Sequence, residues 1–296
     1  MTVIIWGTTW IAISLQNGPV ESFVSIFYRF SIAGFILILC LLLVGKLQKS
    51  TATDHVWFLL QGCCLFCFNF ICFYIASKYM ASGLLSIIFS IAIFFNALNN
   101  AIFWRIKPES TIYLAGILGV MGLILLFWQE INTATGSTSL LKGIGLSVLG
   151  TYFFSLGNMI TVRHNNAGIH PLTSNAYGMS YGALVLLSII FITSTSFAWD
   201  SRPEYLFSLV YLAIPGSVIG FTAYLSLVNR IGANQAAYAT VLFPVVALTI
   251  SYFYEDYQWN LMNSLGLICV LIGNAVALNL FSNLLNKQKT EPSSST

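Results

Sequence analysis

Apolar residues run along this chain in long blocks, separated by short stretches where charged residues, Gly, Pro and Asn gather. The blocks are apolar on every side, as in Phe35–Val44, and lack the alternation of apolar and polar positions that barrel strands show. A helix needs roughly 20 such residues to cross a hydrocarbon core of about 30 Å. The pattern predicts ten membrane-spanning helices, over residues 2–16, 21–44, 56–77, 80–103, 110–128, 141–162, 171–194, 205–228, 231–253 and 259–284.

The composition fits a bilayer as the surroundings of these blocks. Of the 296 residues, 57% are hydrophobic and only 7% are charged, and the mean hydropathy is +0.84. Residues 2–16 are short for a span, since they rise only roughly 22 Å, but they have no basic leading region and we count them as one. Residues 285–296, rich in Lys, Ser and Thr, are predicted to form a disordered tail.

Lysine and arginine are distributed unequally between the two sides that ten spans define. One side collects Lys46, Lys49, Arg105, Lys107, Arg163, Arg230, Lys287 and Lys289. The other side collects Lys78, Lys142 and Arg202. Because basic residues favour the cytoplasmic side, we predict a multi-pass protein of the plasma (bacterial inner) membrane with both termini in the cytoplasm. The same bias accounts for the net charge of +3, so the charge indicates no nucleic-acid partner.

The two halves of the chain match when the second is shifted back by 151 residues. The shift lays Met80-Ala81-Ser82-Gly83 over Ile231-Gly232-Ala233-Asn234, and Ala115 and Gly122 over Gly266 and Gly273. Five spans in each half, an odd number, force the two copies into opposite orientations. We therefore predict an all-α integral membrane protein of ten helices, in which residues 1–128 and 141–284 are two inverted five-helix repeats and residues 285–296 a cytoplasmic tail. Inverted repeats are typical of transporters.

Several short motifs occur in the order and spacing of a known family. They are Trp6-Gly7-Thr8-Thr9-Trp10-Ile11-Ala12, Pro19, Tyr28-Arg29-Phe30, Gly232-Ala233-Asn234-Gln235-Ala236-Ala237, Pro244, Glu255, Gly266 and Gly273. With them nearly the whole chain resembles EamA-type members of the drug/metabolite transporter superfamily. The resemblance implies a central cavity between two inverted repeats, alternating access, and often export of amino acids or other small metabolites. One departure is that the first half has Trp104-Arg105-Ile106-Lys107 where the second half has Glu255.

Arg29 stands out because a charged side chain in hydrocarbon is costly unless it faces protein or water. It lies about eight residues, or roughly 12 Å, into the predicted helix 21–44. Its guanidinium could pair with a substrate carboxylate or phosphate, or form a fixed ion pair with a helix end or with Glu21. The resemblance implies an Arg here in members whose substrates differ, which favours the structural role.

Aromatic and amide side chains are the other candidates, since they offer ring faces and hydrogen-bonding groups to a small solute. With Arg29, the predicted substrate-binding residues are Trp6, Tyr28, Asn69, Tyr74, Ser90, Tyr152, Asn158, Tyr177, Tyr181, Gln235 and Tyr238. The alternative for a single Tyr or Trp is a place in the interfacial belt. For Ser90, which shares a helix face with Ser82 and Ser86, the alternative is close helix packing.

The sequence offers no set of residues typical of catalysis, proton relay, nucleotide binding or metal binding. All nine Asp and Glu and all three His fall in loops or at helix ends, so no buried carboxylate or histidine stands out as a proton relay or catalytic group. No phosphate-cradling glycine loop is present, and the six cysteines are interpreted as packing residues. We predict neither enzyme activity, nor a cofactor, nor a bound metal.

The function predicted from the sequence is secondary transport of a small polar or amphipathic metabolite, such as an amino acid, with export favoured. The partners expected are this small-molecule substrate and the lipid bilayer, and the chain is expected to be a monomer or a homodimer. Uptake, exchange or facilitated diffusion stay open, as does a non-transporting membrane receptor or scaffold.

Overall fold

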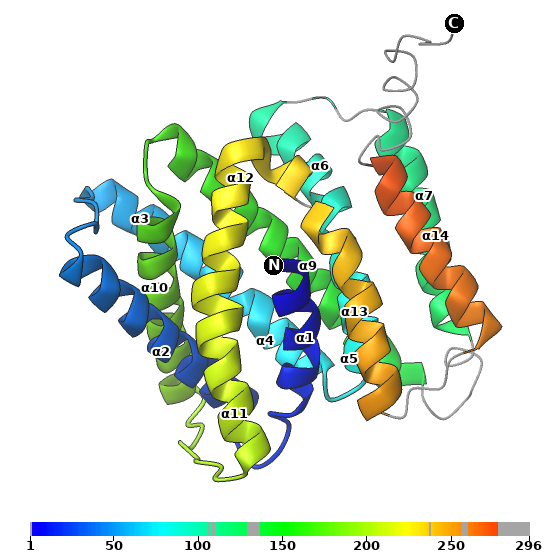
Figure 1. The fold of residues 1–296 in the computed structure, drawn as a ribbon, viewed down its shortest axis with the longest axis horizontal. Helices are drawn as coiled ribbons and strands as arrows, with labels where there is room; N and C mark the ends of the chain where they lie inside the picture. Colours follow the sequence, from blue (N-terminus) through cyan, green and yellow to red (C-terminus); the bar gives the residue numbers. More distant parts are fainter. Residues whose placement is uncertain are drawn as a thin grey trace, which may run out of the picture.

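The structure, a computed structural model, describes residues 2–105, 107, 110–128, 137–236, 238–255 and 260–277. Every regular element within these ranges is a helix, and Figure 1 shows the helices side by side in one bundle. The helices are α1 (Thr2–Ser14), α2 (Ser22–Leu43), α3 (Ala52–Gln61), η1 (Gly62–Phe68), α4 (Asn69–Ala76), α5 (Ser82–Ser90), α6 (Ala92–Trp104), α7 (Ser110–Leu126), α9 (Ser137–Asn166), α10 (Pro171–Ile192), α11 (Pro203–Tyr211), η2 (Leu212–Ile219), α12 (Gly220–Ala236), α13 (Tyr238–Tyr254) and α14 (Leu261–Ala277).

Helix length and composition confirm a multi-pass membrane protein. Within the described ranges, six helical stretches are long and apolar enough to cross a bilayer: Ser22–Leu43, Ala52–Ala76, Ser82–Trp104, Thr138–Asn166, Pro171–Ile192 and Pro203–Ala233. Four shorter apolar helices accompany them: Thr2–Ser14, Ser110–Leu126, Phe243–Tyr254 and Leu261–Ala277. These stretches follow the predicted segments with two differences. The helix expected over 141–162 extends over Ser137–Asn166. The helix expected over 205–228 continues to Ala236, and the one expected over 231–253 begins at Tyr238. The predicted tail 285–296 lies outside the described residues.

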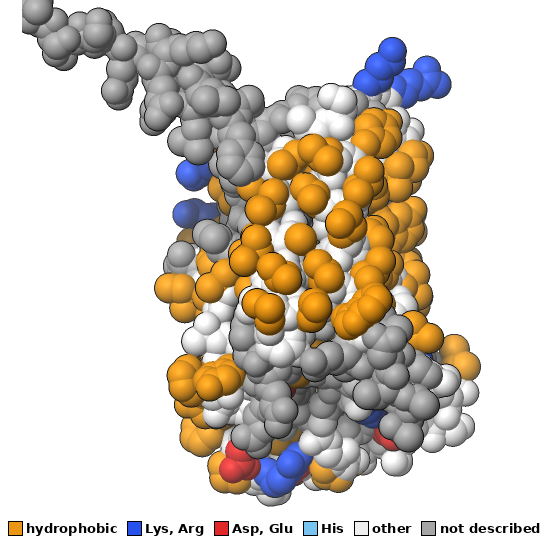
Figure 2. All heavy atoms as spheres, turned by 90° about the vertical axis from the view of Figure 1, so that its right-hand side faces the viewer, with side chains coloured by type: hydrophobic (Ala, Val, Ile, Leu, Met, Phe, Trp, Pro, Cys, Tyr) orange, Lys and Arg blue, Asp and Glu red, His pale blue; other side chains and the backbone are white. Residues whose placement is uncertain are grey.

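The outer surface of the bundle is apolar. Figure 2 shows hydrophobic side chains covering the face formed by α7 and α14, with charged side chains at the two ends of the molecule. On this face Ile117, Ile124 and Ile268 are about half exposed. An apolar band between charged ends is the surface that a helix bundle presents to lipid.

Two of the long helices carry an irregular segment that the apolar pattern does not predict. η1 lies between α3 and α4, and η2 lies between α11 and α12; both are wider, π-helical turns. Pro215 sits inside η2 and has no N–H to donate. The hydroxyl of Ser217 donates to the carbonyl of Leu212 at 2.8 Å and so satisfies a backbone oxygen in this segment.

The irregular segments occupy matching places in the two halves. η2 begins 150 residues after the start of η1 and ends 151 residues after its end. A second pair of breaks has the same spacing, because Ala81 (ψ 147°) precedes α5 in extended conformation and Gly232 (φ 81°, ψ 161°) interrupts α12. The positive φ at Gly232 is one that side-chain-bearing residues rarely adopt.

Helices α7 and α14 cross at glycines, and Figure 1 shows this pair at one side of the bundle. A Cβ added to Gly122 would lie 2.7 Å from the carbonyl oxygen of Gly266, and a Cβ on Gly266 would lie 2.7 Å from that of Gly122. A Cβ on Gly273 would lie 3.0 Å from the carbonyl oxygen of Ala115. The 151-residue shift superimposes Ala115 on Gly266 and Gly122 on Gly273. All four of these matching small residues therefore lie at the same crossing.

Candidate functional site

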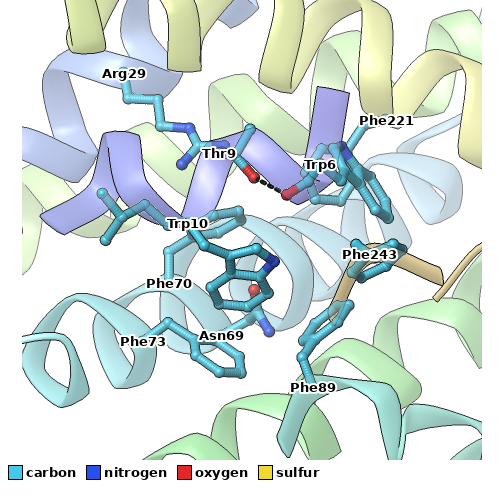
Figure 3. A pocket seen from close by; sticks show the side chains of 11 residues that line it. Trp6, Thr9, Trp10, Arg29, Asn69, Phe70, Phe73, Phe89, Phe221 and Phe243 are labelled. Atoms are coloured by element: carbon cyan, nitrogen blue, oxygen red, sulfur yellow. Dashed lines mark hydrogen bonds between the residues drawn. The ribbon is translucent and has the colours of Figure 1, made fainter. Parts of the chain in front are cut away.

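A cavity of about 40 Å³ lies among helices from both halves of the chain. Figure 3 shows its lining side chains converging from different helices. They are Trp6, Thr9, Trp10 and Ile13 of α1, Arg29 of α2, Asn69, Phe70 and Phe73 of α4, Phe89 of α5, Phe221 of α12 and Phe243 of α13. This volume has room for a few water molecules and is smaller than an ordinary metabolite site.

Helix α1 supplies four of these residues because their spacing follows the helical repeat. Trp6, Thr9, Trp10 and Ile13 recur at intervals of three and four residues, so they share one face. The indole N–H of Trp6 donates to the carbonyl of Gly216 in η2 at 3.1 Å. The hydroxyl of Thr9 donates to the carbonyl of Trp6 at 2.7 Å and is thereby satisfied within its own helix.

Aromatic rings form most of the cavity wall. The ring centroids of Trp6 and Phe221 lie 4.8 Å apart, and those of Trp10 and Phe73 lie 5.1 Å apart in an edge-to-face arrangement. Phe89 approaches Trp10 at 5.4 Å. These geometries are the favourable ones for aromatic pairs, and they give the cavity apolar, polarisable surfaces suited to a flat or branched organic group.

Arg29 is the charged member of the lining, and its side chain is buried. Its Nε donates to Ser217 Oγ at 2.9 Å, which joins α2 to η2. Its guanidinium carbon lies 4.3 Å from the ring centroid of Phe70. The alternative of a pair with Glu21 is not formed, because that carboxylate lies 3.8 Å from the ammonium of Lys78 instead.

Two further polar groups complete the cavity. The amide of Asn69 donates to the carbonyl of Gly150 in α9 at 2.8 Å and holds α4 against that helix. Trp10 Nε1 and Arg29 Nη1 are buried and have no hydrogen-bond partner. Of the predicted substrate-binding residues, Trp6, Arg29 and Asn69 thus meet at one cavity. Two N–H donors among its aromatic rings, Trp10 Nε1 and Arg29 Nη1, are left without a partner.

Two predicted residues lie towards the N-terminal end of α2 and the adjacent loop. The hydroxyl of Tyr28 donates to the carbonyl of Ala198 in the loop after α10 at 3.0 Å. Tyr74 is buried, lies beside the guanidinium of Arg29, and donates to Gln16 Oε1 at 2.8 Å. Neither lines the cavity, although Tyr74 is a direct neighbour of its charged member.

Tyr177 and Tyr181 lie together near the start of α3, away from the cavity. The ring of Tyr177 stacks on Phe58, and the hydroxyl of Tyr181 lies 3.0 Å from Nδ1 of His55. Phe58 also packs against the ring of His164. The expectation that no carboxylate or histidine is buried was wrong for two residues. His164 at the end of α9 turns inward and is fully covered, and Asp200 in the loop before α11 is 5% exposed.

The remaining predicted residues are spread over the bundle. Asn158 donates to Asn96 Oδ1 at 3.3 Å and to the hydroxyl of Tyr224 at 3.2 Å. Ser90 accepts from the amide of Asn274 at 3.1 Å, and Tyr152 packs against Phe95. The side chains of Gln235 and Tyr238 lie outside the described part of the chain.

Most residues of the aromatic wall were not among the predicted substrate-binding residues. The five lining phenylalanines look like any other apolar residue of a membrane helix, so their type carried no signal. Thr9, Trp10 and Ile13 could have been found, since they follow Trp6 at helical spacing on one face. Among the described residues, no group of three His, Cys, Asp or Glu is placed to hold a metal ion.

Comparison with known proteins shows which family has this architecture. The model of the EamA-like transporter family matches residues 1–128 and 141–279. Protein PagO of Salmonella typhimurium is 22% identical over 93% of this chain and 90% of its own, and the transporter YyaM of Bacillus subtilis is 23% identical over 83% and 81%. A crystal structure that is 16% identical, covering 98% of this chain and 96% of that one, shares the fold with a TM-score of 0.69. The chain belongs to the EamA-like transporter family.

Proposed function

We propose that this chain is a secondary transporter that moves a small polar or amphipathic metabolite, such as an amino acid, by alternating access between two inverted five-helix repeats. The observation that carries the proposal is the cavity, which is lined by α1, α2, α4 and α5 of the first half and by α12 and α13 of the second. A site between two repeats is where such transporters bind their substrate. The lining combines aromatic surfaces with a few polar groups, which is the usual composition of a small-molecule site.

The paired irregularities support the repeat organisation over residues 1–128 and 141–284. π-helical segments at matching places, helix breaks at Ala81 and Gly232, and the crossing of α7 with α14 all follow one spacing of about 151 residues. The two ranges matched by the family model point to the same division. Ten spans follow if the four shorter apolar helices also cross the bilayer.

The small size of the cavity supports alternating access. About 40 Å³ does not hold a metabolite, so binding requires the helices around the cavity to separate. Rocking of one repeat against the other around a fixed site separates helices in this way. The cavity thus corresponds to a contracted form of the site.

The distribution of basic residues supports a placement of both termini in the cytoplasm of a bacterial inner membrane. Arg105 follows the last residue of α6, and Arg230 lies in the last turns of α12. Figure 1 shows these two helix ends at the same end of the molecule. Basic residues at one end favour that end as cytoplasmic. We propose export as the direction, and a monomer or a homodimer as the working unit.

Flux measurements on the full chain in proteoliposomes test the transport proposal. We expect radiolabelled small metabolites from a broad panel to include at least one that exchanges across the vesicle wall. Replacement of Ile13 by Phe puts a larger side chain into the cavity, so it is expected to reduce that flux several-fold.

Ile4→Phe is the matched control, because Ile4 is on the same helix and 66% exposed. It is expected to leave flux and thermal unfolding unchanged. Absence of flux for every solute, with intact folded protein, would contradict transport and favour the receptor or scaffold alternative. Equal flux in the Ile13→Phe and Ile4→Phe proteins would show that the transported solute does not pass through this cavity.

A further inference from the structure

Arg29 is a buried cation that no acidic residue neutralises in the part of the chain that the structure describes. Its side chain is 2% exposed, and the ion pairs of the described residues join Lys78 to Glu21, Arg163 to Asp54 and Arg202 to Asp200. The contacts of its guanidinium are neutral: the hydroxyl of Ser217, the phenol of Tyr74 and the ring of Phe70.

A charge in this position is unstable without further compensation. The guanidinium cannot lose its proton under physiological conditions, so the chain cannot avoid the charge by neutralising it. A ring face and two hydroxyls recover part of the lost hydration, but a buried charge normally needs an ion of opposite sign. Nη1 still has an unused N–H group. One bound anion could therefore neutralise the charge of Arg29 and accept a hydrogen bond from its Nη1.

The cavity beside Arg29 limits what that anion can be. Its lining contains no acidic residue, so a cationic group on the ligand would find ring faces and the neutral oxygens of Thr9 and Asn69 there, but no carboxylate. Trp10 Nε1 is a second buried donor without a partner, and it reaches the cavity from α1 while Arg29 reaches it from α2 (Figure 3). The remaining surface is mostly aromatic rings.

We propose that this cavity binds a small monocarboxylate with an aromatic or branched apolar body. When the helices around the cavity separate to admit it, the carboxylate accepts hydrogen bonds from Arg29 Nη1 and Trp10 Nε1, and the apolar body lies between Trp6 and the phenylalanine rings. Two oxygens of a carboxylate match two donors, and hydrogen bonds to a charged group are the stronger kind. The inference rests on the proposed transport function, and it narrows the cargo from a zwitterion to a net anion.

Matched acid and amide pairs test the inference by binding. The purified full chain in lipid nanodiscs is titrated with benzoate, phenylacetate, indole-3-acetate and 4-methylpentanoate, and with the amide of each. We expect at least one acid to bind and to raise the unfolding temperature, while its amide binds roughly ten- to hundredfold more weakly. Failure of all four acids, or equal binding of acid and amide, would overturn the proposal.

Variants separate recognition of the anion from a merely structural role. Arg29→Gln is expected to lower the affinity for the acid to that for the amide, and Arg29→Lys to retain part of the preference, because a lysine keeps the charge but not the planar fork. Arg105→Gln, at an exposed arginine, is the matched control and is expected to keep the full preference. An unchanged acid-to-amide ratio in Arg29→Gln would overturn the proposal.

Trp10→Phe keeps the test decisive if Arg29→Gln does not fold. This variant retains a ring but removes the unpartnered N–H, so it is expected to weaken acid binding several-fold and to leave amide binding unchanged. An unchanged affinity for the acid would remove Trp10 from the site.

Flux distinguishes this inference from the proposed function. If amines or neutral solutes are transported but no acid binds, the proposed transport function stands and the proposed anion site is contradicted. If acids bind in an Arg29-dependent way but no solute is transported, the proposed anion site stands and the proposed transport function is contradicted.

Discussion

At the scale of single residues, buried polar side chains in this chain mostly join helices. Asn69 donates to the carbonyl of Gly150, and Asn263 in α14 donates to the carbonyl of Leu126 in α7, both at 2.8 Å. In a dry interior each such bond satisfies two groups that would otherwise be costly. Arg29 and Trp10 differ because each keeps an unpartnered donor beside the cavity. Gln16, Asn96 and His164 also keep one, but they do not line the cavity.

Asp200 gives a prediction about pH at this scale. It binds the guanidinium of Arg202 at 2.7 Å, and Arg202 also donates to the carbonyl of Asn17, so the pair ties two loops together. This hydrogen bond holds the pKa of Asp200 below its ordinary value of 3.8. A depressed pKa in the folded state means that the stabilising contribution is complete above pH 3.8 and is lost as the pH falls through the lowered value.

Hydrogen exchange in the loop 195–202 measures this effect. Protection is expected to be constant near neutral pH and to fall in the wild type as the pH drops below about 3.8. Asp200→Asn is expected to show the weaker protection already at pH 7, without the acid transition. An acid transition that persists in Asp200→Asn would assign the effect to another group.

Depth along a helix could be read from the sequence, but the direction of a side chain could not. Asn69, Tyr74 and Tyr181 all lie inside predicted spans, yet only Asn69 lines the cavity. The direction depends on how a helix rotates within the bundle, and apolar residues on all sides of a membrane helix leave that rotation unspecified. Trp6 and Arg29 were selected because an indole N–H and a guanidinium are costly in hydrocarbon unless they face protein or water.

At the scale of helices, the most specific contact is the cap on α5. The helix begins at Ser82 after Ala81, which has no side chain able to accept a hydrogen bond. Glu255, just past the end of α13, accepts from the backbone N–H of Ser82 at 2.9 Å and from its hydroxyl at 2.7 Å. A carboxylate at a helix N-terminus is favourable both as an acceptor and through the helix dipole. The first half has Trp104 at the matching place, 151 residues earlier, so that position has no acid to form the same cap.

Replacing Glu255 by Gln is expected to lower stability by about 1 kcal/mol, because the amide keeps an acceptor but loses the charge. Thermal unfolding in detergent measures the change. Glu204→Gln is the control, since Glu204 lies in the first turn of α11 and is exposed. It is expected to lower stability by only a few tenths of a kcal/mol. Equal losses in the two variants would show that the bonds to Ser82 add nothing.

Helix positions were predictable from apolar runs, whereas the irregular segments within them were not. The residues of η1, Gly62–Phe68, are all apolar or small and read as ordinary helix. Pro215 is a signal for a disturbed turn in η2, and Gly232 for a break in α12, but neither residue specifies a π-helical turn.

At the scale of the whole molecule, two crossings join equivalent parts of the two halves. α2 packs on α10 where a Cβ added to Gly34 would lie 2.7 Å from Ser180 Oγ, and α7 packs on α14 through Gly122 and Gly266. Such close approaches need glycine, because lipid provides no hydrophobic drive between helices and association depends on packing. The halves are thereby held together at crossings where backbone meets backbone.

Gly122→Leu is expected to destabilise the protein by about 1–3 kcal/mol, since its side chain would meet the backbone of α14. Gly119→Leu on the same helix is the matched control, because a Cβ there meets nothing within 4 Å. It is expected to change stability by less than about 0.5 kcal/mol. Thermal unfolding in nanodiscs compares the two. Similar losses would mean that the close approach of Gly122 to α14 is not what the substitution disturbs, because Gly→Leu on its own raises helix propensity.

The unneutralised charge of Arg29 has an electrical consequence for the whole transport cycle. The guanidinium stays with the protein, so a monocarboxylate that passes it carries one negative charge across the membrane in each turnover. A membrane potential that is negative inside drives such a charge outwards with about 2.3 kcal/mol per 100 mV. Export of a monocarboxylate would then be electrogenic and driven by the membrane potential, and it would need no second ion to move with the cargo.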